Sequence, residues 1–182
     1  TTSSVIDTPS IGTGFGDAYQ SGVLSVNTTS LSAGGSTQIT ATIVDSGNNN
    51  KKIASEEYTV LFNSSCATDG RAEFSKPEVT TSSGDVTVTY TAKGCSGDDF
   101  ITFGLYPSGT TGAGDRLAVA SGSITVAPPE VGAITYIGVD APLISISTIG
   151  DAVLPKLTTV TFKVVDTANN PIVNQTVDFE LS

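Results

Sequence analysis

An internal repeat constrains the fold of this chain more than any other feature of its sequence. The segment 36–49 reads STQITATIVDSGNN and the segment 157–170 reads LTTVTFKVVDTANN, so that Asp166 lies 121 residues after Asp45. A period of roughly 120 residues is too long for a solenoid repeat and has the size of one small domain. The sequence therefore predicts one complete domain followed by the opening half of a second.

The repeat continues beyond these segments with a small change of register. The segment 58–62 (YTVLF) matches 175–179 (QTVDF) at an offset of 117 residues, which indicates a four-residue insertion around 50–57 of the first copy. By this alignment the second copy stops roughly sixty residues short of the first. We expect the chain to be a segment of a tandem array.

Short runs of alternating apolar and polar residues, separated by turn-forming residues, occupy most of the chain. The clearest run is 86–91, where Val86, Val88 and Tyr90 alternate with threonines, a period typical of a half-buried strand. No stretch shows a sustained 3.6-residue period, and the spacing of the runs favours an antiparallel β-sandwich. Strands are expected in the first copy at 23–26, 37–44, 58–62, 86–91, 100–105 and 117–126, with a weaker one at 72–74 or 79, and in the second copy at 134–139, 143–147, 158–165 and 176–181.

Two stretches lack this alternation. Residues 1–21 are rich in Thr, Ser and Gly and are expected to form a flexible leader. Pro128 and Pro129 favour an extended, rather stiff joint, because each lacks an amide donor and restricts the residue before it. The expected parts are therefore a leader (1–21), an Ig-like domain (22–127), a Pro-Pro linker and hinge (128–131) and a truncated second domain (132–182).

The composition excludes several classes of function. The chain has no histidine, which removes the commonest general base and metal ligand, and with it the Ser-His-Asp and Cys-His nucleophile sites. Its formal net charge of −10 opposes binding to nucleic acid and to anionic lipid. No window of about 20 apolar residues is present to span a membrane. We expect no enzymatic activity, no cofactor and no nucleic-acid partner.

The acidic residues offer only weak candidates for chemistry. Asp98 and Asp99 are neighbours beside an expected strand, so their side chains point to opposite faces, and both are interpreted as turn and surface acids. Calcium needs about six to eight oxygens around one point. Glu130, Asp140 and Asp151 are weak calcium candidates near the expected domain junction, but no Asp-x-Asp-x-Asp loop is present, and we expect no metal site.

Cys66 and Cys95, 29 positions apart, are the only cysteines. An even number of cysteines in a β-rich chain without metal-site spacing favours a disulfide, and the alternative is two free buried thiols in a reducing compartment. Closing this loop would stabilise the fold by roughly 3.5 kcal/mol in the chain-entropy model. A disulfide would also favour the periplasm or the cell exterior over the cytoplasm.

The segment 166–179 (DTANNPIVNQTVDF) resembles the signature of bacterial Ig-like domains of group 1, the modules of invasin and intimin. In the first copy, 42–45 (TIVD) and 59–62 (TVLF) look like parts of the same signature. The stretches 66–72 (CATDGRA) and 85–103 look like a cysteine-bearing variant of these domains that occurs in long proteobacterial surface proteins. The resemblance covers about 22–182 and implies an all-β fold of Ig-like antiparallel sandwiches in tandem.

The resemblance also implies a role at a bacterial cell surface. The expected function is that of an adhesin stalk, whose Ig-like modules space or present a more distal binding element. The protein would then be extracellular and anchored in the outer membrane, with neighbouring Ig-like domains as partners. The alternative is a binding module, in which a loop end of the sandwich recognises a host protein, a glycan or a phage component.

A half sandwich would leave its inner face and its strand edges open. Exposed edges recruit strands, so pairing with another chain, or a dimer, through the truncated second domain is expected as well. The alternative is that this half domain leans on the first domain or on a neighbouring molecule in a lattice.

Overall fold

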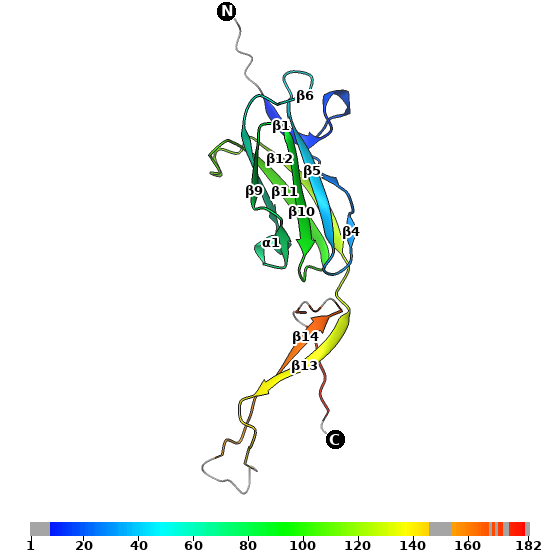
Figure 1. The fold of residues 1–182 in the computed structure, drawn as a ribbon, viewed down its shortest axis with the longest axis vertical. Helices are drawn as coiled ribbons and strands as arrows, with labels where there is room; N and C mark the ends of the chain where they lie inside the picture. Colours follow the sequence, from blue (N-terminus) through cyan, green and yellow to red (C-terminus); the bar gives the residue numbers. More distant parts are fainter. Residues whose placement is uncertain (1–7, 146–153, 168, 170, 173–174, 181–182) are drawn as a thin grey trace, which may run out of the picture. The chain divides into compact units, whose positions relative to one another are not determined.

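The computed structural model describes residues 8–145, 154–167, 169, 171–172 and 175–180. The chain divides into two compact units, Thr1–Pro128 and Pro129–Ser182. In the first unit, two facing β-sheets enclose one apolar core (Figure 1). The expected fold class, an all-β Ig-like antiparallel sandwich, is confirmed by these sheets.

The first sheet is built around β5 (Ser36–Asp45), which has neighbours along both edges. One edge of β5 pairs with β1 (Pro9–Thr13) and β3 (Ser25–Val26), and the other pairs with β10 (Asp85–Ala92) and β6 (Lys51–Lys52). The outer strands are β2 (Gln20–Ser21), beside β1, and β8 (Ala72–Phe74), beside β10. All these pairs are antiparallel, and β5 is the long central strand of the sheet.

The second sheet has the order β4-β12-β11-β7-β9. Its strands are β4 (Ser30–Leu31), β12 (Ala118–Val126), β11 (Gly97–Pro107), β7 (Tyr58–Ser64) and β9 (Glu78–Thr81). Only the short β4 runs parallel to its neighbour, β12. Two single turns of helix complete the described elements of the first unit: η1 (Gly16–Ala18) after β1 and α1 (Ser65–Thr68) after β7.

Alternation places one face of each long strand in the core. Along β10, Val86, Val88 and Tyr90 are buried, as the period of two predicts. β11 buries every second residue from Asp99 to Leu105 in the same way. Each fully buried aliphatic or Phe side chain stabilises the fold by about 1.5–3 kcal/mol relative to its exposed state. β10 and β11 therefore supply the centre of the core from opposite sheets.

The strands expected in the first copy are confirmed, with boundaries that move by a few residues. β5, β7, β10, β11 and β12 occupy the predicted runs, and β8 and β9 both form where only one weaker strand was expected. The sequence missed the two-residue strands β2, β4 and β6, because two residues carry no measurable period.

The expectation of a flexible leader over 1–21 is wrong from Pro9 onwards. β1 pairs with β5 from Pro9 opposite Asp45 to Gly12 opposite Thr42, and Ile11 is fully buried in the core. A strand with one core residue shows no periodicity of its own, so its position is set by the partner strand. Residues 1–7 lie outside the described residues.

The described strands of the second unit are β13 (Val131–Val139) and β14 (Val160–Asp166), which pair antiparallel with irregularities at 131–133 and 136–138 (Figure 1). Both fall on predicted strands. The strands predicted at 143–147 and 176–181 are absent over their described parts, 143–145 and 176–180. A strand needs a ladder of hydrogen bonds to a neighbour, and the described residues give 143–145 only one backbone bond, from the N–H of Ser145 to the carbonyl of Pro155 (2.9 Å).

Hydrogen bonds recur in the two units at acceptors 121 positions apart. In the first unit, Oγ1 of Thr37 accepts a hydrogen bond of 3.0 Å from the N–H of Thr28. In the second, Oγ1 of Thr158 accepts one of 3.0 Å from the N–H of Ala141. A threonine at the start of β5, or just before β14, therefore binds the segment that follows β3 in the first unit and β13 in the second.

Three backbone bonds repeat this correspondence. In the first unit, Asn27 N–H donates to Gln38 O (3.0 Å), Asn48 N–H to Asp45 O (3.1 Å) and Ile53 N–H to Ile43 O (3.1 Å). Their counterparts in the second unit, in the same order, are Asp140 N–H to Thr159 O (3.0 Å), Asn169 N–H to Asp166 O (3.0 Å) and Ile172 N–H to Val164 O (3.1 Å). β14 thus occupies the place of β5, and β13 occupies the places of β1 and β3 in one continuous strand.

Candidate functional site

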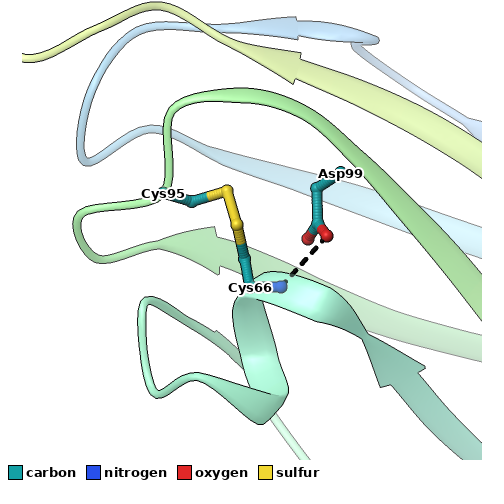
Figure 2. Close-up of side chains that lie close together, drawn as sticks. All are labelled: Cys66, Cys95 and Asp99. Carbon is teal, nitrogen blue, oxygen red and sulfur yellow. Dashed lines mark hydrogen bonds between the residues drawn. A yellow bond between two sulfur atoms is a disulfide. The ribbon is translucent and has the colours of Figure 1, made fainter.

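The most distinctive polar cluster of the first unit joins a disulfide to a buried carboxylate. Cys66 in α1 and Cys95 in the β10–β11 connection form the disulfide, with 5.7 Å between their Cα atoms, as the first of the two alternatives from the sequence predicts. Asp99 on β11 points towards the same place, and Figure 2 shows its carboxylate directed at the backbone nitrogen of Cys66. Helix, connection and strand therefore meet at one point.

Backbone hydrogen bonds fix the two cysteine segments before the disulfide is considered. The carbonyl of Cys66 accepts from the N–H of Arg71 at 2.8 Å, which closes the turn after α1. The carbonyl of Arg71 in turn accepts from the N–H groups of Lys93 (2.8 Å) and Cys95 (2.9 Å). The side chain of Ser64 caps α1 by accepting from the N–H of Ala67 at 3.1 Å. The disulfide thus joins segments that already bind each other.

The interpretation of Asp99 as a surface acid is wrong. Its side chain is 1% exposed; Oδ1 accepts from the N–H of Cys66 at 3.1 Å, and Oδ2 accepts from the hydroxyl of Tyr90 at 2.8 Å. Asp98 points the other way, is exposed, and accepts from Oγ1 of Thr125 at 2.6 Å. The two carboxylates do face opposite sides of the strand, as predicted. Asp99 is in phase with the core residues of β11, and that phase is the signal that could have identified it.

Tyr90 contributes a bond between the two sheets. It lies on β10 in the first sheet, whereas Asp99 lies on β11 in the second. Burial raises the pKa of the Tyr90 hydroxyl well above its ordinary value, and the hydrogen bond and the charge of Asp99 raise it further, while Arg71 lowers it. The hydroxyl therefore stays protonated and donates to Asp99 over the whole physiological pH range.

Cys66, Cys95 and Asp99 bring two sulfurs and a carboxylate oxygen within 4.8 Å of one another. The thiolate is the form of cysteine that binds metal, and here the two sulfurs are bonded to each other. Both carboxylate oxygens already accept hydrogen bonds. The chemistry of this donor set is that of a structural tie between α1, β10 and β11.

The calcium candidates do not converge. Glu130 precedes β13 and Asp140 follows it, both exposed, so they lie at opposite ends of a nine-residue strand. At about 3.3 Å per residue this separates them by roughly 30 Å, too far to share one ion. Asp151 lies outside the described residues.

Pro128 and Pro129 lie in the segment between the end of β12 at Val126 and the start of β13 at Val131. Neither belongs to a strand, and Pro128 is exposed. Their role as a hinge stays a prediction. Among the described residues, no helix is long and apolar enough to cross a membrane.

One loop end of the first unit is hollowed. A hollow of about 280 Å³ is lined by Asp45, Asn48, Lys51, Lys52, Ile53, Ala54 and Ser55. A second hollow, of about 540 Å³, shares Asn48, Lys51 and Lys52 with the first and adds Phe15, whose side chain is 63% exposed. Oδ1 of Asp45 accepts from the N–H groups of Thr8 and Gly47, whereas its buried Oδ2 has no partner among the described residues. Sequence reasoning did not identify this end as a site.

No protein-family model and no curated protein matches the chain. Solved structures do. The chain is similar to WR4, a C. elegans MSP family member, at 13% identity and a TM-score of 0.40, over 58% of this chain and 98% of that one. It is similar to a glycosyl hydrolase family 2 member from Bacteroides cellulosilyticus at 20% identity and a TM-score of 0.41, over 56% of this chain and 14% of that one.

A third similar structure is FdeC, an Escherichia coli adhesin, at 17% identity and a TM-score of 0.38; the match covers 92% of this chain and 43% of that one. The chain thus spans less than half the length of two of these three proteins. Their different natures, and the low scores, leave the assignment of a function to the residues of this chain.

Proposed function

We propose that the chain is a structural segment of an extracellular bacterial protein, in which Ig-like units are stacked into a stalk that spaces or presents a more distal binding element. The observation that carries this proposal is the recurrence of equivalent hydrogen bonds in the two units, with acceptors 121 residues apart. A chain that builds the same strand pair twice is built by repetition, and repeated sandwiches provide length. The partners are then neighbouring Ig-like domains of the same protein.

The disulfide supports the extracellular placement. A bond between Cys66 and Cys95 persists in an oxidising compartment and is rare in the cytoplasm. The tie formed by Tyr90, Asp99 and the disulfide strengthens one end of the sandwich, which suits a unit that transmits force. Anchoring in an outer membrane is part of the proposal and follows from the resemblance to the invasin and intimin modules.

The polar chemistry of the first unit supports a non-enzymatic role. Both carboxylate oxygens of buried Asp99 are occupied by internal hydrogen bonds, the chain has no histidine, and its charge of −10 disfavours nucleic acid. The stalk proposal therefore expects no turnover and no saturable ligand. A glycan array and a pull-down of host surface proteins, both with the whole chain, test it; saturable binding to the first unit would overturn it as a complete account.

The second candidate function is a binding module, and the hollowed loop end favours it. Exposed Phe15 lies beside an amide (Asn48) and an ammonium (Lys51), a combination of apolar surface and polar groups that is typical of ligand sites. Under this candidate a glycan, a host protein or a phage component would contact these residues.

Two variants and one control separate the candidates. If the loop end binds, Phe15→Ala and Asn48→Ala each weaken the binding detected in the array by about tenfold or more. Phe100→Ala is the control, because Phe100 is also exposed (69%) but lies on β11, in the second sheet. Equal effects of Phe15→Ala and Phe100→Ala would refute a site at the loop end.

A further inference from the structure

The second unit presents an open strand edge. In the first unit, β5 pairs along both edges, with β1 and β3 on one and with β10 on the other. β14 pairs with β13 on one edge. Along its other edge, the described residues provide only a bridge between Val165 and Pro171 and the bond from Ile172 to Val164. Within the described part of the chain, residues 160–163 of β14 therefore have no strand in the place that β10 takes beside β5.

The backbone groups on this edge can be identified. The N–H of Ile43 donates to the carbonyl of Gly84 beside β10, so Ile43 faces the β10 edge of β5. Val164 takes the same place in β14, and its carbonyl accepts from Ile172. Because backbone groups alternate along a strand, the N–H and C=O of Val160 and Phe162 face the open edge, and those of the residues between them face β13.

The side chains beside this edge are also uncovered. Val160 is 46% exposed and Phe162 is 38% exposed, whereas Ile39 and Ala41, their counterparts on β5, are 0% and 4% exposed. The rings of Tyr136 on β13 and Phe162 lie 5.9 Å apart, so Tyr136, itself 54% exposed, belongs to the same face. The residues whose backbone groups face the open edge, Val160 and Phe162, therefore also carry the exposed apolar side chains.

Across from Phe162, one more aromatic ring lies on this face. Phe179, which the repeat aligns with core residue Phe62, contacts the Phe162 ring with 4.8 Å between centroids, yet stays 66% exposed. This contact covers the face in part. The remaining backbone donors and acceptors need a partner that offers an equally spaced row of such groups, and only a β-strand does so.

From this correspondence, we propose that the open edge of β14 binds an antiparallel strand with the chemistry of β10, in which β-branched or aromatic residues alternate with threonine. The register follows from the first unit, where Val88 lies opposite Ile39 and Val86 opposite Ala41. The bound strand places the equivalent of Val88 opposite Val160 and the equivalent of Val86 opposite Phe162.

Charge supports this register. In the first unit Asp85 lies opposite Thr42 and forms an ion pair with Lys52. The residue of β14 that corresponds to Thr42 is Lys163, which is exposed. An acid at the start of the bound strand therefore lies directly opposite a lysine, a favourable cross-strand pair. A helix or an acidic loop would leave the backbone N–H and C=O groups of Val160 and Phe162 without partners. The inference concerns β14 alone and holds whether or not the protein acts as a stalk.

The test supplies the strand in the same molecule. The whole chain is extended after Ser182 by a flexible Gly/Ser linker of about 20 residues, whose mean span of about 25 Å matches the length of β14, and by a copy of Asp85–Ala92 (DVTVTYTA). Linking raises the effective concentration of the strand to the millimolar range. Amide hydrogen exchange of Val160 and Phe162, followed by NMR, is expected to slow by about tenfold or more relative to the unextended chain.

Two matched variants of the appended copy test the register. Val88 and its even-numbered neighbours in β10 face β5, whereas Thr89 bonds Ser75 beside β8. Val88→Pro in the copy removes an N–H that faces β14 and is expected to abolish the protection; Thr87→Pro removes one that faces away and keeps most of it. Unchanged exchange at Val160 and Phe162, equal loss with both prolines, or protection confined to β5 and β8 would each overturn the proposal. None of these results depends on glycan or host-protein binding, which tests the stalk.

Discussion

The hydroxyl of Tyr90 donates a 2.8 Å hydrogen bond to Oδ2 of Asp99, and this bond joins the two sheets of the first unit inside the core. The other carboxylate oxygen of Asp99 holds the N–H of Cys66, whose sulfur is bonded to Cys95. One buried carboxylate therefore connects β10, β11 and α1. A buried polar group of this kind stabilises a fold only while each partner is present.

Asp99→Ala is expected to lower the free energy of unfolding of the first unit by about 3 kcal/mol or more. The substitution leaves the Tyr90 hydroxyl and the Cys66 N–H buried without an acceptor, and each such group costs about 1–3 kcal/mol. Urea denaturation followed by circular dichroism measures the loss. Asp98→Ala is the matched control: Asp98 is exposed, and its removal should change stability by about 0.5 kcal/mol or less. Equal losses would contradict the structural role of Asp99.

Raising the pH above about 10 is expected to destabilise the first unit through Tyr90. The pKa of Tyr90 is raised in the folded state by burial and by Asp99. Above the ordinary pKa of tyrosine the unfolded chain loses this proton while the folded chain keeps it. The contribution is therefore complete below pH 10 and declines by about 1.4 kcal/mol per pH unit until the folded-state pKa is passed.

Unfolding free energies of the wild type and of Tyr90→Phe, measured between pH 9 and pH 11, isolate this effect. The two proteins share every other ionisable group, so the difference between the two curves belongs to Tyr90. The difference should shrink as the pH rises, because the Tyr90→Phe variant lacks the hydrogen bond at every pH and has no proton to release at this position. A constant difference across the range would show that the Tyr90 hydroxyl titrates alike in both states.

Gly84→Ala is expected to cost about 3 kcal/mol of stability, since two independent effects add at this residue. Gly84 has φ +73, where an L-residue is strained by roughly 1–2 kcal/mol, and an added Cβ would lie 2.3 Å from the carbonyl oxygen of Ile53. Gly70→Ala is the control with the strain alone: its φ is +71, but an added Cβ meets no atom within 4 Å. It should cost about 1 kcal/mol in the same denaturation assay. If both substitutions lower the free energy of unfolding by a similar amount, the backbone around Ile53 moves to accommodate the added Cβ at little cost.

The alternation of side chains predicts most of the sandwich, because burial on one face imposes a period of two on every long strand. β10 is the clearest case, with Val86, Val88 and Tyr90 in the core. The same rule does not find β1, where Ile11 is the core residue that matters and pairing with β5 supplies the rest. Strands of two to five residues are determined by their neighbours, which a local pattern does not contain.

Site residues follow the same division. The pairing of Cys66 with Cys95 could be predicted from the count of cysteines, since a chain with only two offers one disulfide. The burial of Asp99 does not follow from the expected strand at 100–105, because Asp99 lies just before it; β11 begins at Gly97, so that Asp99 shares the phase of Ile101 and Phe103. In the second unit, the apolar alternation of 176–180 predicts a strand that lacks a partner among the described residues, so the pattern is present without the pairing.

The disulfide is expected to shorten the extension that follows mechanical unfolding of the first unit. Cys66 and Cys95 are 29 residues apart, and at about 3.5 Å per extended residue an intact bond withholds about 100 Å of chain. Single-molecule pulling from both ends of the chain should therefore show an unfolding step about 100 Å longer after reduction. Reduction should also lower the free energy of unfolding by about 3.5 kcal/mol. The double variant Cys66→Ala/Cys95→Ala is the control and should give the long step with or without reductant. If the length of the wild-type step does not change on reduction, the two thiols are free, and the disulfide no longer supports an extracellular stalk.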